Sequence, residues 1–493
     1  MKKKDKGLSA WQLTMMALGS VIGGSFFLGS SVAIQAAGPA ILLSFIFGGL
    51  LVYFILYALS EMTVANPDSG SFYTFTAQVF GPGTGFVVGW IYWTGMVLAM
   101  SSEATAVSIL LKEWIPNLSI PLMGSIIIVA VTLVNLLGAD KLSKLESSLA
   151  IVKVFAIISF IIIALLLVIG AIPGTPAVGI GELNREPLMP GGIKSIAGSM
   201  LIVIFSYAGF EIIGLAASEA DNPSKTIPRA IAYTVLTLVG FYILSVVALL
   251  PLIPTAELSE DVSPMVAALN RWGMGWAGTV INIILVTAIL STMMAAMFGL
   301  GRMMRSVADE GHAPKWLKEK TDVPYRGIIF SGIAMLVGLW VGLFFPRVYL
   351  FLLSSGGFAS LVTYAAILAT HIKFRKCNGC PPEGKCQMPG YPYTSWFALV
   401  SIVVIIISMP FISGQSSGLI AGIIMTALYW LIYFVMNRLQ NKVVMKNMNH
   451  SSPKVFHARL SEEFSEELTD KTKKKNDFKQ CDKSNESKDE SKQ

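Results

Sequence analysis

Residues 19–30 read GSVIGGSFFLGS and place Gly19, Gly23, Gly24 and Gly29 inside the first long apolar segment of the chain. A glycine in a helix interior costs about 1 kcal/mol relative to alanine, so this cluster needs a structural reason. One reason is close helix packing, because Gly19 and Gly23 form a small-xxx-small pair. The other is a broken helix. Unwinding at Ile22 to Ser25 would free backbone N–H groups that suit a carboxylate.

The composition of the chain is that of a membrane protein. Of 493 residues, 54% are hydrophobic and 14% are charged, and the mean hydropathy is +0.65. Soluble proteins carry about 25% charged residues. Apolar runs of about 18 to 25 residues recur along the chain, each long enough to cross about 30 Å of hydrocarbon as a helix. This pattern excludes a soluble enzyme, and the scattered basic residues do not form a nucleic-acid-binding domain.

The apolar runs predict an all-α integral membrane protein with twelve transmembrane helices. The predicted spans cover residues 11–36, 40–61, 86–110, 121–138, 148–171, 194–217, 229–251, 274–300, 327–345, 348–371, 394–412 and 416–437. An even number of spans places both chain ends on one side. Most loop Lys and Arg residues fall on that side, and the other side carries Lys112, Arg185, Lys194, Arg271 and Arg347. The positive-inside bias therefore predicts cytoplasmic N- and C-termini.

Three parts of the chain follow from this pattern. Residues 1–10 form a basic cytoplasmic leader that is retained, and residues 11–437 form the twelve-helix domain. Residues 438–493 mix charges and offer too little apolar area to offset the entropy of ordering. They are predicted to be a disordered cytoplasmic tail.

The sixth span carries an ionisable residue, Glu211, at the end of FSYAGFE (205–211). A carboxylate at membrane depth is a functional-site hypothesis, and the other interpretation is a glutamate that braces an unwound segment. Spans one and six stand five apart. Two interrupted segments at that spacing are what an inverted repeat of five plus five helices predicts, with a binding site between them. The repeats would cover about 11–171 and 194–371, followed by extra helices at about 394–437.

Two further ionisable residues are predicted at membrane depth, Glu103 in span three and Lys153 near the start of span five. Lys153 could snorkel to the membrane surface. Alternatively, it could lie against the broken helix, take the place of a sodium ion and exchange a proton. Glu103 could bond to neighbouring helices or serve proton coupling.

The cysteines do not suggest a secreted disulfide framework. Cys377, Cys380 and Cys386 lie in one predicted cytoplasmic loop and Cys481 lies in the tail, which favours reduced thiols. Three thiols fall short of a structural zinc site unless His371, Cys481 or a second chain contributes a ligand. All histidines, His371 included, are predicted in loops or the tail, so no set of serine, histidine and acid at membrane depth suggests hydrolysis. Neither a metal nor a cofactor is expected.

Four stretches carry a resemblance to a known family. They are GSVIGGSFFLGS, SEMTVANPDSGSFYTFTAQVFGPGTGFVVGWIYW (60–93), FSYAGFE with the following SEADNPSKTIPRAI, and GLGRMMRSVADEGHAPK after span eight. Together they resemble the bacterial amino acid permeases of the amino acid, polyamine and organocation (APC) superfamily. The resemblance implies a LeuT-type five-plus-five inverted repeat with broken helices one and six, plus two C-terminal helices. It also implies an amino acid substrate, with a proton instead of sodium as the coupling ion.

The resemblance further implies roles for the backbone at the two breaks. Ile22, Gly23, Gly24 and Ser25 match the span-one backbone that binds the substrate carboxylate. This chain reads GGSFF where many members read G-[ST]-G-[LI]-F, so the glycine and the small hydroxyl residue are exchanged.

In span six, the backbone of Phe205, Tyr207 and Ala208 matches the ammonium site, and Phe205 also matches the aromatic gate. Glu211 matches the family glutamate after the unwound segment. Lys153 matches a lysine that fills the sodium position in relatives, and Glu103 resembles the span-three glutamate of amino acid/proton symporters. Lys153, Glu211, Glu103 and Phe205 are therefore the expected coupling or gating residues.

The function expected from these observations is import of an amino acid across a bacterial plasma membrane by proton symport with alternating access. An amino acid exchanger and a permease-like sensor that signals through the polar tail are the alternatives. A channel is disfavoured because no span shows a charged ring or a filter-like loop.

Overall fold

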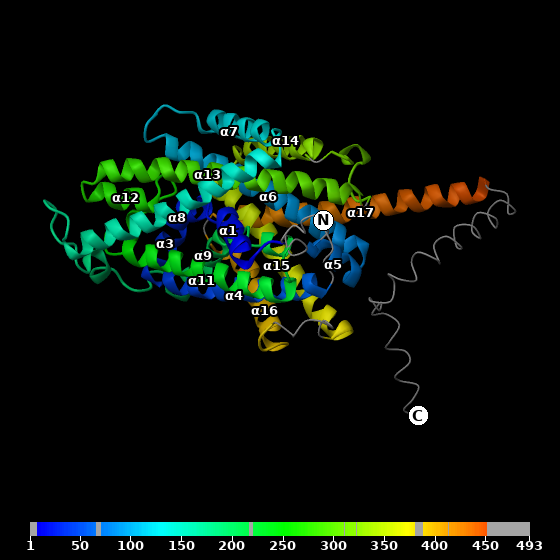
Figure 1. Ribbon diagram of the computed structural model, residues 1–493, viewed down its shortest axis with the longest axis horizontal. Coiled ribbons are helices and arrows are strands. Elements are labelled where there is room, and N and C mark those ends of the chain that lie inside the picture. The colour runs from blue at the N-terminus through cyan, green and yellow to red at the C-terminus, as the bar shows by residue number, and fades with distance from the viewer. Residues whose placement is uncertain are drawn as a thin grey trace, which may run out of the picture.

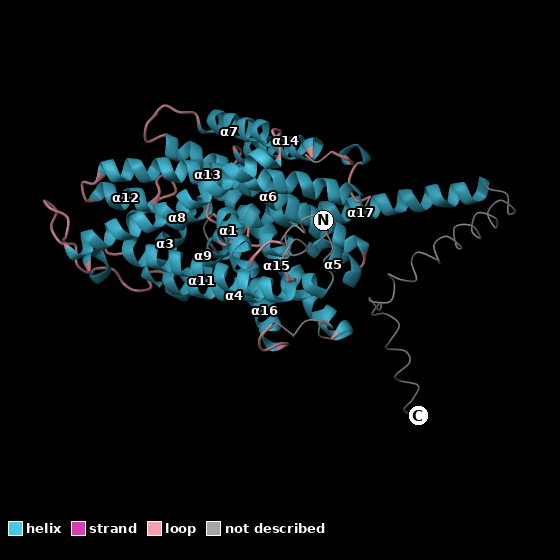
Figure 2. Cartoon of the chain, in the orientation of Figure 1, coloured by secondary structure: helices cyan, strands magenta, loops and turns pink. Residues whose placement is uncertain are grey.

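The computed structural model describes residues 7–65, 71–215, 220–309, 311–321, 323–379, 388–412 and 414–450. These residues form an elongated bundle of helices joined by loops (Figures 1 and 2). Within these ranges no strand is assigned, and β-type pairing is limited to an isolated bridge between Leu8 and Ala220. The all-helical prediction agrees with this architecture.

In the first half of the bundle, the first helix is interrupted after Val21, and the chain reverses its direction after Ala37. Its helices are α1 (Ala10–Val21), α2 (Gly24–Phe27), α3 (Gly29–Ala37), α4 (Ile41–Ala65), α5 (Ser71–Phe80), α6 (Pro82–Leu111), α7 (Ile120–Asn135) and α8 (Ala139–Ile169).

The second half begins with another interrupted helix and ends with a long helix that projects from the bundle. Its helices are α9 (Gly192–Ser206), α10 (Ile212–Leu215), α11 (Pro223–Leu249), α12 (Pro264–Arg271), α13 (Gly275–Asp309), α14 (Tyr325–Gly342), α15 (Val348–Asn378), α16 (Tyr393–Ser408) and α17 (Ser416–His450). The end of α17 extends beyond the rest of the bundle (Figure 1).

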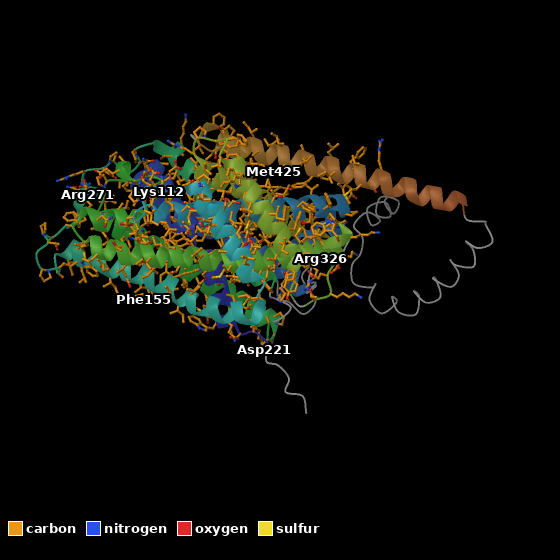
Figure 3. The ribbon with its side chains drawn as sticks, turned by 90° about the horizontal axis from the view of Figure 1, so that it is seen from above. Lys112, Phe155, Asp221, Arg271, Arg326 and Met425 are labelled. Atoms are coloured by element: carbon orange, nitrogen blue, oxygen red, sulfur yellow. The ribbon has the colours of Figure 1, made fainter. Side chains whose placement is uncertain are left out.

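Nine helical segments of the described part are long and apolar enough to cross a membrane. Two more helices, α7 and α9, are apolar but shorter. Large apolar side chains cover the outside of the bundle, among them Phe155 at its edge (Figure 3). An apolar exterior of this kind is suited to lipid, which is as apolar as the side chains themselves.

Helix α3 packs against α9, and the two helices are antiparallel. At one end, the Ser206 hydroxyl donates to the Ser25 carbonyl at 3.2 Å. At the other end, Gly38 has a φ of 60°, and a Cβ built there would lie 2.5 Å from the Pro190 ring. As the residue number rises along α3, its partner on α9 therefore falls.

Helix α4 runs alongside α9 and parallel to it. The Ala40 N–H donates to the Leu188 carbonyl at 3.0 Å, and the hydroxyls of Ser44 and Ser199 are 2.8 Å apart. The chain thus reverses within residues 38–40, although a short 3-10 turn (Gly38–Ala40) makes residues 29–65 continuously helical. Gly38 permits the reversal because its φ lies in the left-handed region.

The structure differs from the predicted spans in its connecting segments. Helices α5 and α12 lie between predicted spans, and α8 begins nine residues before the predicted residue 148. Helix α17 continues through His450, whereas the predicted span ended at residue 437 and the predicted disordered tail began at 438. Residues 1–6 of the leader and 451–493 of the tail lie outside the described residues.

Basic residues lie at both ends of the bundle. Lys112 and Arg271 lie toward one end in Figure 3, and Arg326 lies toward the other. These are the two sides that the loop charges distinguish in the sequence.

Candidate functional site

The first helix is broken at the glycine cluster. Helix α1 ends at Val21, Gly23 is extended with φ −145° and ψ −162°, and α2 begins at Gly24. The first N–H groups of a helix have no acceptor inside it, so a break in the bundle interior requires one from elsewhere. The broken-helix interpretation of the glycines therefore describes this segment, and it requires polar partners at the break.

Glu103 of α6 supplies the acceptor. Its Oε2 accepts from the Gly24 N–H at 2.7 Å, and its Oε1 accepts from the Ser25 N–H at 3.3 Å. A Cβ at Gly24 would lie 2.7 Å from Glu103 Oε2 and 3.2 Å from the Ala106 methyl group. Glycine at position 24 thus lets the backbone approach the carboxylate, and Glu103 itself is only 4% exposed.

Lys153 satisfies the other side of the same break. Its Nζ donates to the Gly19 carbonyl at 2.5 Å and to Thr292 Oγ1 at 2.7 Å, and Thr292 in turn donates to the Ile22 carbonyl at 3.0 Å. Lys153 is 0% exposed, so the snorkelling interpretation does not describe this structure. Its ammonium instead lies against carbonyl groups that the break leaves without helical donors.

The sixth predicted span is broken as well. Helix α9 ends at Ser206, residues 207–211 form turns, and α10 begins at Ile212. Gly209 has a φ of 106°, and a Cβ there would lie 2.8 Å from the Ser20 carbonyl oxygen. The Ser20 hydroxyl donates to the Gly209 carbonyl at 2.9 Å. Both the backbone conformation and the close approach to α1 therefore require glycine.

Glu211 braces this second break. Its Oε2 accepts from the Gly209 N–H at 2.8 Å, and its Oε1 accepts from the Tyr364 hydroxyl of α15 at 2.6 Å. The carboxyl is 2% exposed. Of the two interpretations of this residue, the structure displays the bracing contacts.

The two broken segments cross in opposite directions. Ser206 contacts Ser25 and Gly209 contacts Ser20. As the number rises on the later segment, it falls on the earlier one. Two regions separated by about 180 residues in sequence thus meet next to their helix breaks.

The predicted residues of the second break are buried around this crossing. Phe205 lies against Gly356, where a Cβ would come within 3.5 Å of its ring. The Tyr207 hydroxyl donates to the Phe45 carbonyl at 3.0 Å. Ala208 is half-buried, and its N–H donates to the Phe205 carbonyl at 3.0 Å.

Three further residues at the crossing escaped sequence reasoning, in addition to Tyr364. Thr292 bridges Lys153 and Ile22 as described. The Tyr349 hydroxyl donates to the Gly24 carbonyl at 3.2 Å, and Tyr242 stacks on Phe26 with ring centroids 3.9 Å apart. Threonine and tyrosine are common in apolar helices, so nothing in the sequence marks them.

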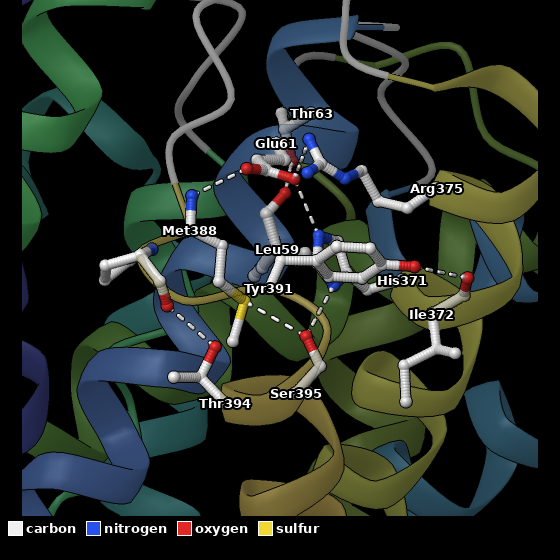
Figure 4. A network of polar contacts seen from close by, with 11 residues as sticks. Leu59, Glu61, Thr63, His371, Ile372, Arg375, Met388, Tyr391, Thr394 and Ser395 are labelled. Atoms are coloured by element: carbon white, nitrogen blue, oxygen red, sulfur yellow. Dashed lines mark hydrogen bonds and ion pairs between the residues drawn. The ribbon is translucent and has the colours of Figure 1, made fainter.

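A second buried polar network lies where α4, α15 and the segment before α16 meet (Figure 4). Glu61 Oε2 is 2.7 Å from His371 Nε2 and 3.5 Å from an Arg375 nitrogen, and Glu61 Oε1 accepts from the Met388 N–H at 2.6 Å. His371 Nδ1 is 3.3 Å from the Ser395 hydroxyl. Glu61 and His371 are both 0% exposed.

This network corrects one expectation and adds a residue. His371 was expected in a cytoplasmic loop, but it lies inside α15 because α4 and the segment before α16 cover the end of that helix. Glu61 was not predicted, since it lies at the edge of the second apolar run.

The cysteine loop also departs from expectation. Cys377, near the end of α15, is disulfide-bonded, whereas a reduced thiol was expected there. Cys380, Cys386 and Cys481 lie outside the described residues, and so does any site that they would form. Among the described residues, no cluster of three His, Cys, Asp or Glu side chains could hold a metal ion.

A cavity of about 360 Å³ lies between the ends of α6, α12 and α13. Its polar lining includes Lys112, Glu113, Asp261 and Asn282. The predicted binding residues do not line it.

These features define a multi-pass α-helical membrane protein in which two broken helices cross, with a buried lysine and two buried glutamates at the breaks. The sequence pattern of the amino acid permease family matches residues 12–447. The chain therefore belongs to the amino acid permease family, whose members are transporters and not enzymes.

Relatives from two bacterial species agree with this assignment. The chain is 33% identical over 438 residues to the uncharacterized amino acid permease YtnA of Bacillus subtilis (strain 168), an alignment that covers 87% of this chain and 94% of the relative. It is 33% identical over 432 residues to the gamma-aminobutyric acid permease of Escherichia coli (strain K12), covering 85% and 93%. It is 31% identical over 418 residues to the aromatic amino acid transport protein AroP of Escherichia coli O157:H7, covering 83% and 91%.

Proposed function

We propose that this permease is a secondary active transporter that imports an amino acid across the plasma membrane together with a proton, by exposing a site between α1 and α9 alternately to each side. The observation that carries the proposal is the Lys153 ammonium, which lies where the first helix breaks and bonds to the Gly19 carbonyl. A cation at that point can stand in for a metal ion and, unlike a metal ion, can lose a proton.

The proposal includes twelve spans of the LeuT type. Counted this way, α1 to α3 form the first span and α9 with α10 the sixth. The reversal at residues 38–40 separates α3 from α4 and supports this count. The shorter apolar helices α7 and α9 then complete the set beside the long apolar segments. Helix α9 is short because its span is broken and continues in α10.

In this arrangement the backbone of Ile22, Gly23, Gly24 and Ser25 receives the substrate carboxylate. Backbone N–H groups at a helix break favour an anion. The backbone of Phe205, Tyr207 and Ala208 receives the ammonium group, with Phe205 as the gate. The contact between the two segments supports both assignments. The Ser206 hydroxyl donates to the Ser25 carbonyl and the Ser20 hydroxyl donates to the Gly209 carbonyl, so the two breaks lie next to each other.

Lys153 links the proton to the conformational cycle. While charged, it bonds to Gly19 and Thr292 and holds the broken helix against α8 and α13. Deprotonation removes the positive charge from these contacts, so the broken helix can move relative to the two helices. Glu211, fixed by Tyr364, holds the second break in the conformation that binds the substrate.

The substrate is proposed to be an amino acid with a free carboxylate and a free ammonium group. Two relatives are named for gamma-aminobutyric acid and for aromatic amino acids, compounds that differ widely in structure. The carboxylate and the ammonium group are what these compounds share. One methylene in a pocket changes affinity by about 1–3 kcal/mol, so family membership does not select among side chains.

Transport of radiolabelled amino acids into proteoliposomes tests the proposal. We expect gamma-aminobutyric acid, L-phenylalanine or another member of a full amino acid panel to accumulate when an inward proton gradient is imposed. Accumulation should collapse on addition of a protonophore. Lys153→Ala should retain substrate binding but lose the stimulation by the gradient. Exchange without net accumulation would instead identify an antiporter.

Orientation is tested by cysteine labelling in intact cells. We expect an impermeant maleimide to label a cysteine at Ser416, which is exposed at the start of α17, and not one at Lys320 in the basic loop before α14. The reverse pattern would contradict cytoplasmic termini.

A further inference from the structure

Glu103 lies where the substrate carboxylate is expected. Its two oxygens accept from the N–H groups of Gly24 and Ser25, at 2.7 and 3.3 Å. These are two of the groups assigned above to the substrate carboxylate. A backbone N–H donates one strong hydrogen bond, so a second carboxylate cannot bind both groups while Glu103 does.

The surroundings of Glu103 make simultaneous occupancy by two anions unfavourable. The titratable groups that face it are Lys153 of α8, Tyr242 of α11 and Tyr349 of α15. Thr292 of α13 contributes a hydroxyl close to Gly23. Of the described residues, Lys153 contributes the ammonium group that faces Glu103, and two carboxylates in one buried site cannot both stay charged without a large cost.

Tyr349 and Ser206 hold the backbone at the break through its carbonyl groups. The Tyr349 hydroxyl donates to the Gly24 carbonyl, and Ser206 donates to the Ser25 carbonyl. The Gly24–Ser25 peptide group is thus held through its carbonyl while its N–H points at Glu103, and the Ser206 contact holds the next peptide group. A carboxylate that left would leave two oriented donors ready for another carboxylate.

We propose that Glu103 is a tethered competitor of the substrate: its carboxylate closes the empty site, the substrate carboxylate replaces it on the Gly24 and Ser25 N–H groups, and the released Glu103 takes up a proton. This inference rests on the proposed transport function. It places the proton that accompanies substrate binding on Glu103, whereas the Lys153 proton accompanies the later movement of the broken helix. The exchange is balanced, because one carboxylate replaces another on the same donors and the added proton neutralises the displaced one. Substrate and proton would therefore bind together.

The competing explanation is a permanent helix cap. In that case Glu103 stabilises the break and the substrate binds elsewhere, so its removal weakens binding or leaves it unchanged. A competitor behaves in the opposite way, because its removal tightens binding of ligands that carry a carboxylate.

The experiment compares purified wild-type protein with Glu103→Gln and Glu103→Ala by thermal shift and isothermal calorimetry. The probes are gamma-aminobutyric acid and L-phenylalanine, each matched with the amine that lacks the carboxylate, n-propylamine and phenethylamine. We expect the variants to bind the amino acids about tenfold or more tightly than wild type, the scale of one hydrogen bond to a charged group. The two amines should show no gain.

The pH dependence supplies a second readout. Wild-type affinity for the amino acid should rise up to about tenfold per unit of falling pH in the range where Glu103 takes up its proton. Glu103→Gln should abolish this slope. Glu113→Gln is the matched control, since its exposed carboxylate lies just beyond the same helix and bonds to Asn282. It should change neither affinity nor slope.

Each outcome has a distinct meaning. Equal or weaker binding by both Glu103 variants, with normal binding by wild type, overturns the competitor and leaves the transporter proposal intact. A slope that persists in Glu103→Gln assigns the proton to Lys153 and also overturns the inference. Binding that appears only in the variants supports it. If neither wild type nor variants bind any amino acid of a full panel, the proposed function fails and the inference fails with it.

Discussion

Two buried glutamates of this permease are held in different ways. Glu61, at the end of α4, bonds to His371 and the Met388 N–H and lies 3.5 Å from Arg375. Glu103, in the middle of α6, bonds to two backbone N–H groups at a helix break. Glu61 is held by two side chains and one backbone N–H that are all placed around this carboxylate. The partners of Glu103 suit any carboxylate that reaches them.

The difference separates a structural role from an exchangeable one. Removing one partner of a buried ion pair leaves an uncompensated charge, so the contacts of Glu61 lock α4 to α15. Backbone donors at a break remain oriented when their acceptor leaves, so the contacts of Glu103 can be transferred to a ligand. Burial alone therefore does not tell which carboxylate takes part in transport.

The largest expected effect tests the Glu61 network. Glu61→Ala strips the acceptor from His371, Arg375 and the Met388 N–H and should lower stability by about 3–5 kcal/mol. Thermal melting of the detergent-purified protein measures it. The control is Glu257→Ala, which removes an exposed carboxylate paired with Arg271 and should cost about 0.2–1 kcal/mol. Equal losses in the two variants would remove the distinction drawn for Glu61.

The next effect concerns Glu211, which resembles Glu61 in having a side-chain partner. Tyr364→Phe removes the hydroxyl that donates to Glu211 and should cost about 1.5–3 kcal/mol. The loss should shrink in a Glu211→Gln background, which a double-mutant cycle measures by melting. Additive losses would mean that the two residues act independently and that Tyr364 does not brace the break.

A smaller effect tests how closely the break is packed. Gly24→Val places a side chain where Glu103 Oε2 lies, 2.7 Å from the new Cβ. The valine side chain would fill the space in which a substrate carboxylate meets the Gly24 N–H, so amino acid affinity should fall about tenfold or more, the scale of one hydrogen bond to a charged group. Gly240→Val is the matched control, because a Cβ at Gly240 of α11 meets nothing within 4 Å. Calorimetry should show unchanged affinity for the control, and normal affinity for Gly24→Val would contradict a binding site at the break.

The smallest effect lies at the edge of the Glu61 network. Ser395→Ala removes a hydroxyl that is 3.3 Å from His371 Nδ1, a long contact that should contribute only about 0.5 kcal/mol. Melting should barely distinguish this variant from wild type. A loss as large as that of Glu61→Ala would show that Ser395, and not Glu61, fixes the orientation of His371.

Sequence reasoning located the residues that are chemically unusual in an apolar span. Gly24, Glu103, Lys153 and Glu211 each carry a cost, in helix propensity or in desolvation, that requires a structural reason. Thr292 and Tyr364 carry no such cost, so only their contacts with Lys153 and Glu211 reveal them. Glu61 was not predicted and His371 was placed in a loop for another reason, since a polar residue at the end of an apolar run is indistinguishable from one in a loop.

The sequence by itself indicated a helical membrane protein with interruptions in two helices, because hydrophobic run length and glycine cost are local quantities. The class of amino acid permease came from the resemblance of its motifs to that family. Only the tertiary structure decided which donor meets which acceptor. Glu61 and His371 are 310 positions apart, and Gly24 and Glu103 are 79 apart. Such pairs form because an unpaired polar group in an apolar interior is costly, and the packing of whole helices decides which partner is within reach.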